Sequence, residues 1–141
     1  MSHSEPHRIL IVEDHSIMRS VLTRLVEREE DLVVCGEASS AEEALERVAD
    51  LQPDLVLIDI SLPGMSGINL IRELREQFPN LASLIVSGHK ESIYGREVMR
   101  AGAYGYVEKA NAHGIIDAIR HILQGGAYFG GERLSRTASE G

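Results

Sequence analysis

Short apolar runs alternate with amphipathic stretches along the chain, and this alternation limits the folds that it can adopt. The runs have the length of buried strands, and they lie at residues 8–12, 32–36, 55–58, 84–86 and 104–107. The stretches between and after them space apolar residues three and four positions apart, as an amphipathic helix does. Because strands that alternate with helices pair in parallel through right-handed crossovers, we predict an α/β fold, a doubly wound (βα)5 sandwich.

The composition indicates a soluble globular domain, with 43% apolar and 26% charged residues. The formal charge of −8 argues against tight, non-specific binding of this chain to nucleic acids or to an anionic membrane. No apolar run approaches the roughly 18 residues of a membrane span, and the N-terminus lacks the apolar core of a signal peptide, so we expect a cytoplasmic protein. Cys35, the only cysteine, excludes an intrachain disulfide framework.

Three segments are expected along the chain. Residues 1–7 are predicted to be a disordered N-terminus, residues 8–124 to form one domain, and residues 125–141 to be a linker or tail. The last segment is rich in glycine and has no sustained periodicity. Ser40, Ser66 and Asn111 can cap helices inside the domain, although Ser39 can equally cap the helix that Ser40 precedes.

Charged and hydroxyl side chains stand where four of the predicted strands end. Glu13 and Asp14 follow the first strand, Asp59 the third, Ser87 ends the fourth and Lys109 follows the fifth. Because the carboxyl ends of parallel strands share one edge, we expect these side chains to converge. Three nearby carboxylates repel one another unless a cation lies among them, and oxygen ligands suit Mg²⁺. Asp59 lies centrally in this set and is the candidate nucleophile of an aspartyl-phosphate reaction.

Four motifs occur in an order that is typical of one known family. They are Ile9-Leu-Ile-Val-Glu-Asp14, Leu55-Val-Leu-Ile-Asp59-Ile-Ser-Leu-Pro-Gly64, Val86-Ser-Gly88 and Gly102-Ala-Tyr-Gly-Tyr-Val-Glu-Lys109. Over residues 8–124 the chain resembles the receiver domains of bacterial two-component response regulators. The resemblance implies a flavodoxin-like fold, whose five-stranded parallel sheet has the order 2-1-3-4-5.

The resemblance also implies a phosphorylation site. Asp59 would accept a phosphoryl group from the phosphohistidine of a sensor histidine kinase. Mg²⁺ would be held by Glu13, Asp14, Asp59 and the backbone carbonyl of Ser61. Such a receiver is not an enzyme in the ordinary sense, because it catalyses only its own phosphoryl transfer and dephosphorylation.

A switch is implied by three further residues. Ser87 and Lys109 would contact the phosphoryl oxygens, and Tyr106 matches the aromatic switch position of the family. Phosphorylation would change the surface near the fourth helix, the fifth strand and the fifth helix, and a homodimer through this face is possible. Tyr104 and Tyr106 are two residues apart and are expected to share one face of their strand.

The end of the chain resembles one subclass of receivers. Lys109-Ala110 and the stretch Gly125-Gly-Ala-Tyr-Phe-Gly130 look like receivers joined to a LuxR-type helix-turn-helix output domain. We therefore expect a transcriptional output, with DNA bound through a C-terminal domain that this chain lacks. The alternative is a stand-alone receiver that regulates a protein partner. Many receivers have a cis proline where this chain has Ala110, so the sequence leaves the isomer of that bond open.

Two other functions are compatible with the fold class. A magnesium-dependent phosphohydrolase can also use an aspartyl nucleophile, but such enzymes have a second acid two residues after it, where this chain has Ser61. A flavin or nucleotide site would need a loop rich in glycine or hydroxyl groups after the first strand. Glu13 and Asp14 occupy that loop and would repel phosphate.

Overall fold

Strands and helices alternate five times in the computed structural model, which describes residues 5–136, and the described chain then ends in a β-hairpin. The strands are β1 (His7–Val12), β2 (Leu32–Ala38), β3 (Leu55–Ile58), β4 (Ala82–Ser87), β5 (Gly105–Glu108), β6 (Gly126–Phe129) and β7 (Glu132–Ser135). The helices are α1 (Ser16–Glu27), α2 (Ala41–Leu51), α3 (Gly67–Gln77), α4 (Glu91–Ala101) and α5 (Ala112–Leu123). None of the described helices is long and apolar enough to cross a membrane.

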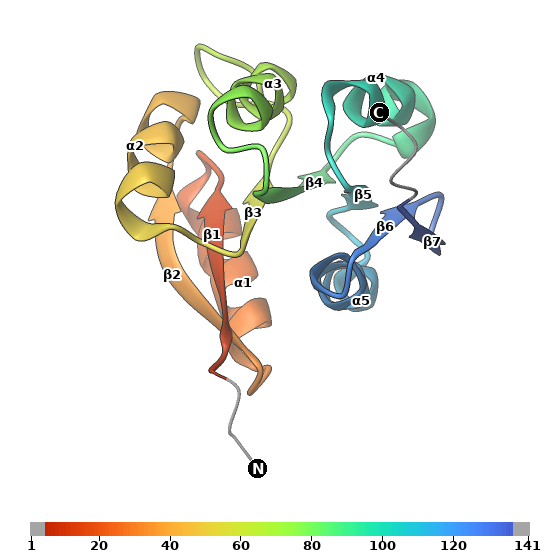
Figure 1. Cartoon of the computed structure of the whole chain (residues 1–141), viewed down its shortest axis with the longest axis horizontal. Coiled ribbons are helices and arrows are strands. Elements are labelled where there is room, and N and C mark those ends of the chain that lie inside the picture. The colour runs from red at the N-terminus through yellow and green to blue at the C-terminus, as the bar shows by residue number, and fades with distance from the viewer. Residues whose placement is uncertain (1–4, 137–141) are drawn as a thin grey trace.

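The strands form one sheet of order β2-β1-β3-β4-β5-β6-β7, which is parallel from β2 to β6. Helices α2, α3 and α4 cover one face, and α1 and α5 cover the other (Figure 1). The predicted doubly wound fold and the order 2-1-3-4-5 of the first five strands are therefore confirmed. Strand β1 pairs with both β2 and β3, so the direction in which successive strands are added reverses at β1. The loops that follow β1 and β3 therefore lead to helices on opposite faces of the sheet.

Alternate residues of the central strands supply two separate core layers. In β1, Leu10 and Val12 pack toward α2, α3 and α4, whereas Ile9 and Ile11 pack toward α1 and α5. All four are fully buried. Helices on both faces leave no solvated side to the central strands β1, β3 and β4, and this explains why these strands are continuous apolar runs rather than alternating ones.

Side-chain caps begin three of the helices, as the sequence predicts. The hydroxyl of Ser40 accepts a hydrogen bond from the Glu43 amide at 3.1 Å, and the Glu43 carboxylate accepts one from the Ser39 amide at 2.8 Å. Ser40 is therefore the cap, and Ser39 takes the reciprocal bond. Ser66 and Asn111 cap α3 and α5 in the same way.

The predicted strand number is wrong, because β6 and β7 add a hairpin after α5. Gly130 and Gly131 form its two-residue turn with φ of 65° and 74°, values that glycine adopts without strain. Tyr128 and Phe129 are buried, and the Tyr128 amide donates to the Tyr104 carbonyl at 2.8 Å. Most of the segment at residues 125–141, predicted to be a linker or tail, is thus part of the sheet. The burial of Tyr128 and Phe129 beside β5 explains this attachment.

The ends of the chain add two details. β1 begins at His7, inside the segment predicted to be disordered. The remaining predictions for residues 1–4 and 137–141 lie outside the described residues. The boundaries of the domain at residues 8 and 124 stay a prediction.

Candidate functional site

The carboxyl ends of four strands bring the predicted polar side chains to one edge of the sheet. The Asp59 amide donates to the Val12 carbonyl at 3.0 Å, and the Lys109 amide donates to the Ser87 carbonyl at 2.8 Å, so these strand ends are in register. The residues Glu13, Asp59 and Ser87 are almost completely buried, with exposed fractions of 0%, 4% and 0%. Buried polar side chains at a sheet edge indicate a site rather than a solvated surface.

Lys109 joins two of the acids. Its Nζ atom lies 2.8 Å from Glu13 Oε1 and 3.3 Å from Asp59 Oδ1. Burial acts to lower the pKa of the Lys109 ammonium, but its contact with Glu13 and the charge of Asp59 outweigh burial, so the pKa lies above its ordinary value. Lys109 is therefore a fixed positive charge between the two carboxylates.

The pKa of the Asp59 carboxyl is shifted by its surroundings. Burial, with the charge of Glu13 added to it, raises the pKa of the Asp59 carboxyl, although Lys109 and the Ser61 amide act in the opposite direction. The carboxylate is thus poorly hydrated and only partly neutralised. Both properties favour a cation or a reaction that consumes its negative charge.

This pKa shift predicts how stability depends on pH in the absence of metal. A carboxyl whose pKa is raised by folding binds more protons in the folded state, so stability falls as pH rises from about 4 through the raised pKa. We expect Asp59→Asn to remove this loss and to be more stable than the unchanged chain at neutral pH. Urea unfolding of both proteins between about pH 4 and pH 7 measures it, and an Asn variant that is less stable at neutral pH would contradict the prediction.

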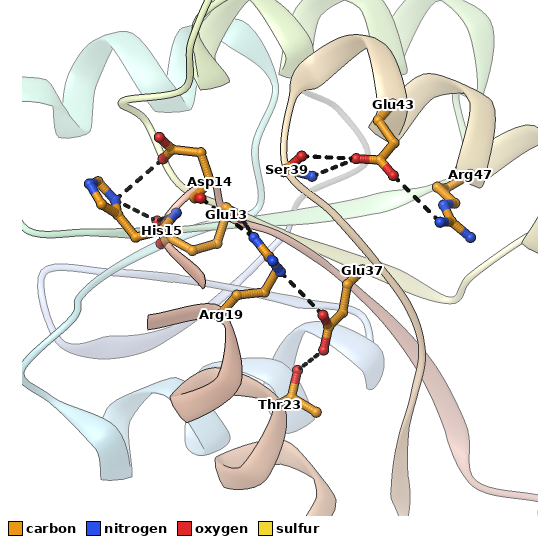
Figure 2. A network of polar contacts seen from close by, with 9 residues as sticks. All are labelled: Glu13, Asp14, His15, Arg19, Thr23, Glu37, Ser39, Glu43 and Arg47. Carbon is orange, nitrogen blue, oxygen red and sulfur yellow. Dashed lines mark hydrogen bonds and ion pairs between the residues drawn. The ribbon is translucent and has the colours of Figure 1, made fainter. Parts of the chain in front are cut away.

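The acid pair after β1 has the features of a cation site (Figure 2). Ligand atoms of Glu13, Asp14 and His15 lie within 4.8 Å of one another. His15 Nδ1 is 3.2 Å from Glu13 Oε2 and 3.4 Å from Asp14 Oδ1. The buried Glu13 Oε1 atom pairs with Lys109, whereas the buried Asp14 Oδ1 atom accepts no hydrogen bond from the described residues. A buried carboxylate oxygen without a donor, beside a second buried carboxylate, fits a hard cation such as Mg²⁺.

The predicted ligand set is brought together only in part. Asp59 is linked to Glu13 through Lys109, whereas the cluster of close ligand atoms holds His15 in place of Asp59. Ser61 is exposed, and its hydroxyl lies 3.2 Å from His89 Nε2. Coordination by Asp59 and by the Ser61 carbonyl stays a prediction.

Ser87 and Tyr106 meet at the β4–α4 loop. The Ser87 hydroxyl accepts a hydrogen bond from the His89 amide at 2.9 Å, and the Tyr106 hydroxyl donates to the His89 carbonyl at 2.7 Å. Tyr106 is fully buried, and burial raises the pKa of its phenol. The loop after Ser87 therefore connects the site with the α4 side of the sheet.

Tyr104 does not share a face with Tyr106, contrary to the sequence prediction. Tyr104 packs in the α1 and α5 layer and Tyr106 in the other. Tyr104 precedes the first residue of β5, so the two-residue strand period does not apply to it. The Lys109–Ala110 bond, whose isomer the sequence left open, is trans, like the other described peptide bonds.

Gly67, which the sequence did not single out, places the backbone of Asp59. Its amide donates to the Ile60 carbonyl at 2.8 Å, and a Cβ atom here would overlap the Asp59 carbonyl oxygen and lie 2.9 Å from Ile60 Cα. No motif in the sequence marks this approach between α3 and the loop after β3.

Gly67→Ala is expected to lower the free energy of unfolding by about 1–3 kcal/mol, because the added methyl group must displace backbone. Gly88→Ala is the matched control, since a Cβ atom at Gly88 meets nothing within 4 Å. Chemical denaturation of both variants measures the difference. Equal free energies of unfolding for the two variants would show that the loop after β3 can move to accept the methyl group without loss of stability, and would contradict the prediction.

Comparisons with known proteins agree with this geometry. The family model described as the response regulator receiver domain matches residues 9–120. The transcriptional regulatory protein DegU of Brevibacillus brevis is 33% identical over 122 residues, which cover 86% of this chain and 52% of DegU. The transcriptional activator protein ExaE of Pseudomonas putida is 39% identical over 121 residues, which cover 85% of this chain and 56% of ExaE. The chain thus spans about half the length of the curated relatives that it matches.

Solved structures show the same fold. A two-component response regulator of the LuxR family from Aurantimonas sp. SI85-9A1 is 35% identical and aligns with a TM-score of 0.85. The alignment covers 88% of this chain and 89% of that one. The added strands β6 and β7 leave the flavodoxin-like arrangement of the first five strands unchanged.

Proposed function

The chain belongs to the response regulator receiver domain family, and we propose on this premise that it is a phosphorylation switch whose phosphoryl acceptor is Asp59. The observation that carries the proposal is the buried Asp59 carboxylate, which Lys109 links to Glu13 beside the buried Asp14 Oδ1 atom, an oxygen that accepts no hydrogen bond from the described residues. A sensor histidine kinase is the proposed donor. The proposal makes the chain a signalling protein rather than an enzyme that turns over an external substrate.

The reaction requires little of the protein beyond position and charge. A carboxylate oxygen of Asp59 attacks the phosphorus atom, the bond from phosphorus to the donor nitrogen breaks, and the imidazole that leaves takes up a proton. The Lys109 ammonium lies where it can balance charge on the phosphoryl oxygens, and the Ser87 hydroxyl can donate to one of them once it leaves the His89 amide.

Glu13 and Asp14 would hold Mg²⁺, with Asp59 and the Ser61 carbonyl as the further proposed ligands. When bound, Mg²⁺ supplies positive charge to the phosphoryl oxygens. The buried Asp14 Oδ1 atom, which accepts no hydrogen bond from the described residues, supports this assignment. His15 then competes with the metal for the same carboxylates, because it contacts both of them.

The switch is proposed to run through the β4–α4 loop. Movement of the Ser87 hydroxyl toward the phosphoryl group would break its bond with His89, and His89 is also the residue that accepts the hydrogen bond of Tyr106. The phosphoryl group adds about −1.5 to −2 charges at the site, which is enough to reorganise a few hydrogen bonds. The α4 side of the sheet would respond.

A homodimer through α4, β5 and α5 is proposed as the form that this response favours. Strand β6 lies beside β5, and the hairpin contacts both flanking helices. The Gly130 amide donates to Glu91 of α4 at 2.7 Å, and Arg133 donates to Asp117 of α5 at 2.8 Å. A second copy on this face would therefore meet β6 and β7 as well as the helices.

The output is proposed to be transcriptional, because the relatives DegU and ExaE carry that description. DNA would be bound by a C-terminal domain rather than by this net-acidic chain. A stand-alone receiver that acts on a protein partner is the alternative. In either case we propose that the protein works in the cytoplasm, where its kinase would present the phosphohistidine.

The test is incubation with Mg²⁺ and acetyl phosphate, followed by intact-mass measurement. We expect one phosphoryl adduct that forms only with Mg²⁺ and is labile, as an acyl phosphate is. Rapid release of phosphate from many esters without an adduct would favour the phosphohydrolase instead. Absence of both an adduct and Mg²⁺ binding would overturn the proposal.

A further inference from the structure

Arg19 of α1 contacts the backbone that carries the acid pair (Figure 2). Its Nη1 atom donates to the Glu13 carbonyl at 2.7 Å and lies 3.5 Å from the Asp14 carbonyl, in a weaker contact. Because a peptide group is planar and rigid, a restrained carbonyl restrains the whole peptide group. The directions in which the Glu13 and Asp14 side chains leave the backbone therefore depend on Arg19.

The guanidinium of Arg19 is itself held from the opposite side. Its Nε atom donates to Glu37 Oε1 at 3.2 Å, and the Thr23 hydroxyl donates to the other oxygen of Glu37 at 2.7 Å. The Arg19 side chain is 21% exposed, whereas that of Glu37 is 42% exposed, so water reaches the carboxylate end of this pair more easily than the guanidinium. A guanidinium can serve a carboxylate on one edge and a carbonyl on another, which an ammonium cannot do with the same geometry.

The acid pair needs such support because the Asp14 side chain receives little. Asp14 Oδ1 is buried and accepts no hydrogen bond from the described residues, whereas Glu13 Oε1 pairs with Lys109 at 2.8 Å. Both carboxylates carry like charge, and each contacts the largely exposed ring of His15. In the metal-free protein, Lys109 offsets part of the repulsion between the carboxylates through its contact with Glu13, and the backbone that bears both side chains resists the rest.

We propose that Arg19 is a positioning residue for the Mg²⁺ site: through the Glu13 and Asp14 carbonyls it holds the acid pair in the arrangement that binds the metal. This inference rests on the proposed function of the same site. Arg19 does not touch the metal or the phosphoryl group, so its effect should appear in metal affinity rather than in the transfer step. Outer partners of metal ligands contribute about 10- to 100-fold in affinity in other proteins.

Arg19→Ala is expected to weaken Mg²⁺ binding about tenfold, measured by titration calorimetry on the full chain. At saturating Mg²⁺ the rate of adduct formation from acetyl phosphate should stay within about threefold of the unchanged chain, because the reacting groups are intact. Arg19→Lys should recover part of the affinity. Arg47→Ala is the matched control, since among residues 5–136 Arg47 pairs only with Glu43 on the surface of α2, at 3.4 Å, and its loss should leave Mg²⁺ affinity unchanged.

A second readout is amide hydrogen exchange in the metal-free protein. Arg19→Ala should speed exchange at Asp14 and His15 and leave β3 and β4 protected. Faster exchange throughout the sheet, or Mg²⁺ affinity equal to that of the unchanged chain, would overturn the inference. If Arg19→Ala does not fold, Glu37→Gln, which keeps the arginine but weakens its anchor, should lower Mg²⁺ affinity severalfold, and an unchanged affinity would again overturn it. Failure of the unchanged chain to bind Mg²⁺ would instead overturn the proposed function.

Discussion

Replacing Asp59 with asparagine is expected to abolish the phosphoryl adduct. The substitution keeps the volume and shape of the side chain in its buried position, but an amide oxygen is a far weaker nucleophile than a carboxylate. We expect adduct formation to fall by at least about 100-fold, measured as intact mass after incubation with Mg²⁺ and acetyl phosphate. The variant should remain folded, since it removes a charge whose burial is unfavourable.

Asp50→Asn is the matched control for this experiment. Asp50 is exposed on α2, and its loss changes the net charge by the same amount without touching the site. The control should form the adduct at the rate of the unchanged chain. An adduct that persists in Asp59→Asn would place the acceptor at another residue and would refute the assignment.

Lys109→Met is expected to reduce both stability and phosphorylation. The substitution leaves the buried Glu13 and Asp59 carboxylates without their shared positive charge. Removing one partner of a buried ion pair costs about 3–5 kcal/mol, and we expect a loss at the lower end of this range, because Asp59 can take up a proton. The rate of adduct formation should fall by about 100- to 1,000-fold, as for other groups that stabilise charge in a transition state.

The pH dependence separates this effect from a general packing defect. Protonation of Asp59, whose carboxyl pKa is raised by burial, removes one of the two unpaired charges, so the stability difference between Lys109→Met and the unchanged chain should shrink as pH falls toward the ordinary carboxyl range of about 4. Lys90→Met is the control, because Lys90 is exposed and is the only other lysine. A stability loss that does not change with pH, or an equal loss in Lys90→Met, would contradict the role given to Lys109.

Sequence periodicity predicted the layers of this fold well, since the central strands β1, β3 and β4 are buried on both faces and read as continuous apolar runs. Sequence periodicity missed the hairpin of β6 and β7 because β6 begins with glycine and β7 is an exposed, polar strand, so neither reads as a buried apolar run. The Gly130-Gly131 turn between short runs was the available signal. Sequence periodicity also placed Tyr104 and Tyr106 on one face, because it does not reveal that β5 begins only after Tyr104.

The sequence by itself determined which side chains stand at the carboxyl edge of the sheet, since in parallel strands the residue after each apolar run must emerge there. Only the tertiary structure decided how these side chains are paired, since it places Lys109 between Glu13 and Asp59. It also decided that Arg19 of α1 is held by Glu37 of β2. The physical reason is that strand ends follow from local periodicity. Contacts of a few ångströms depend instead on how separate segments pack and on which rotamers that packing allows.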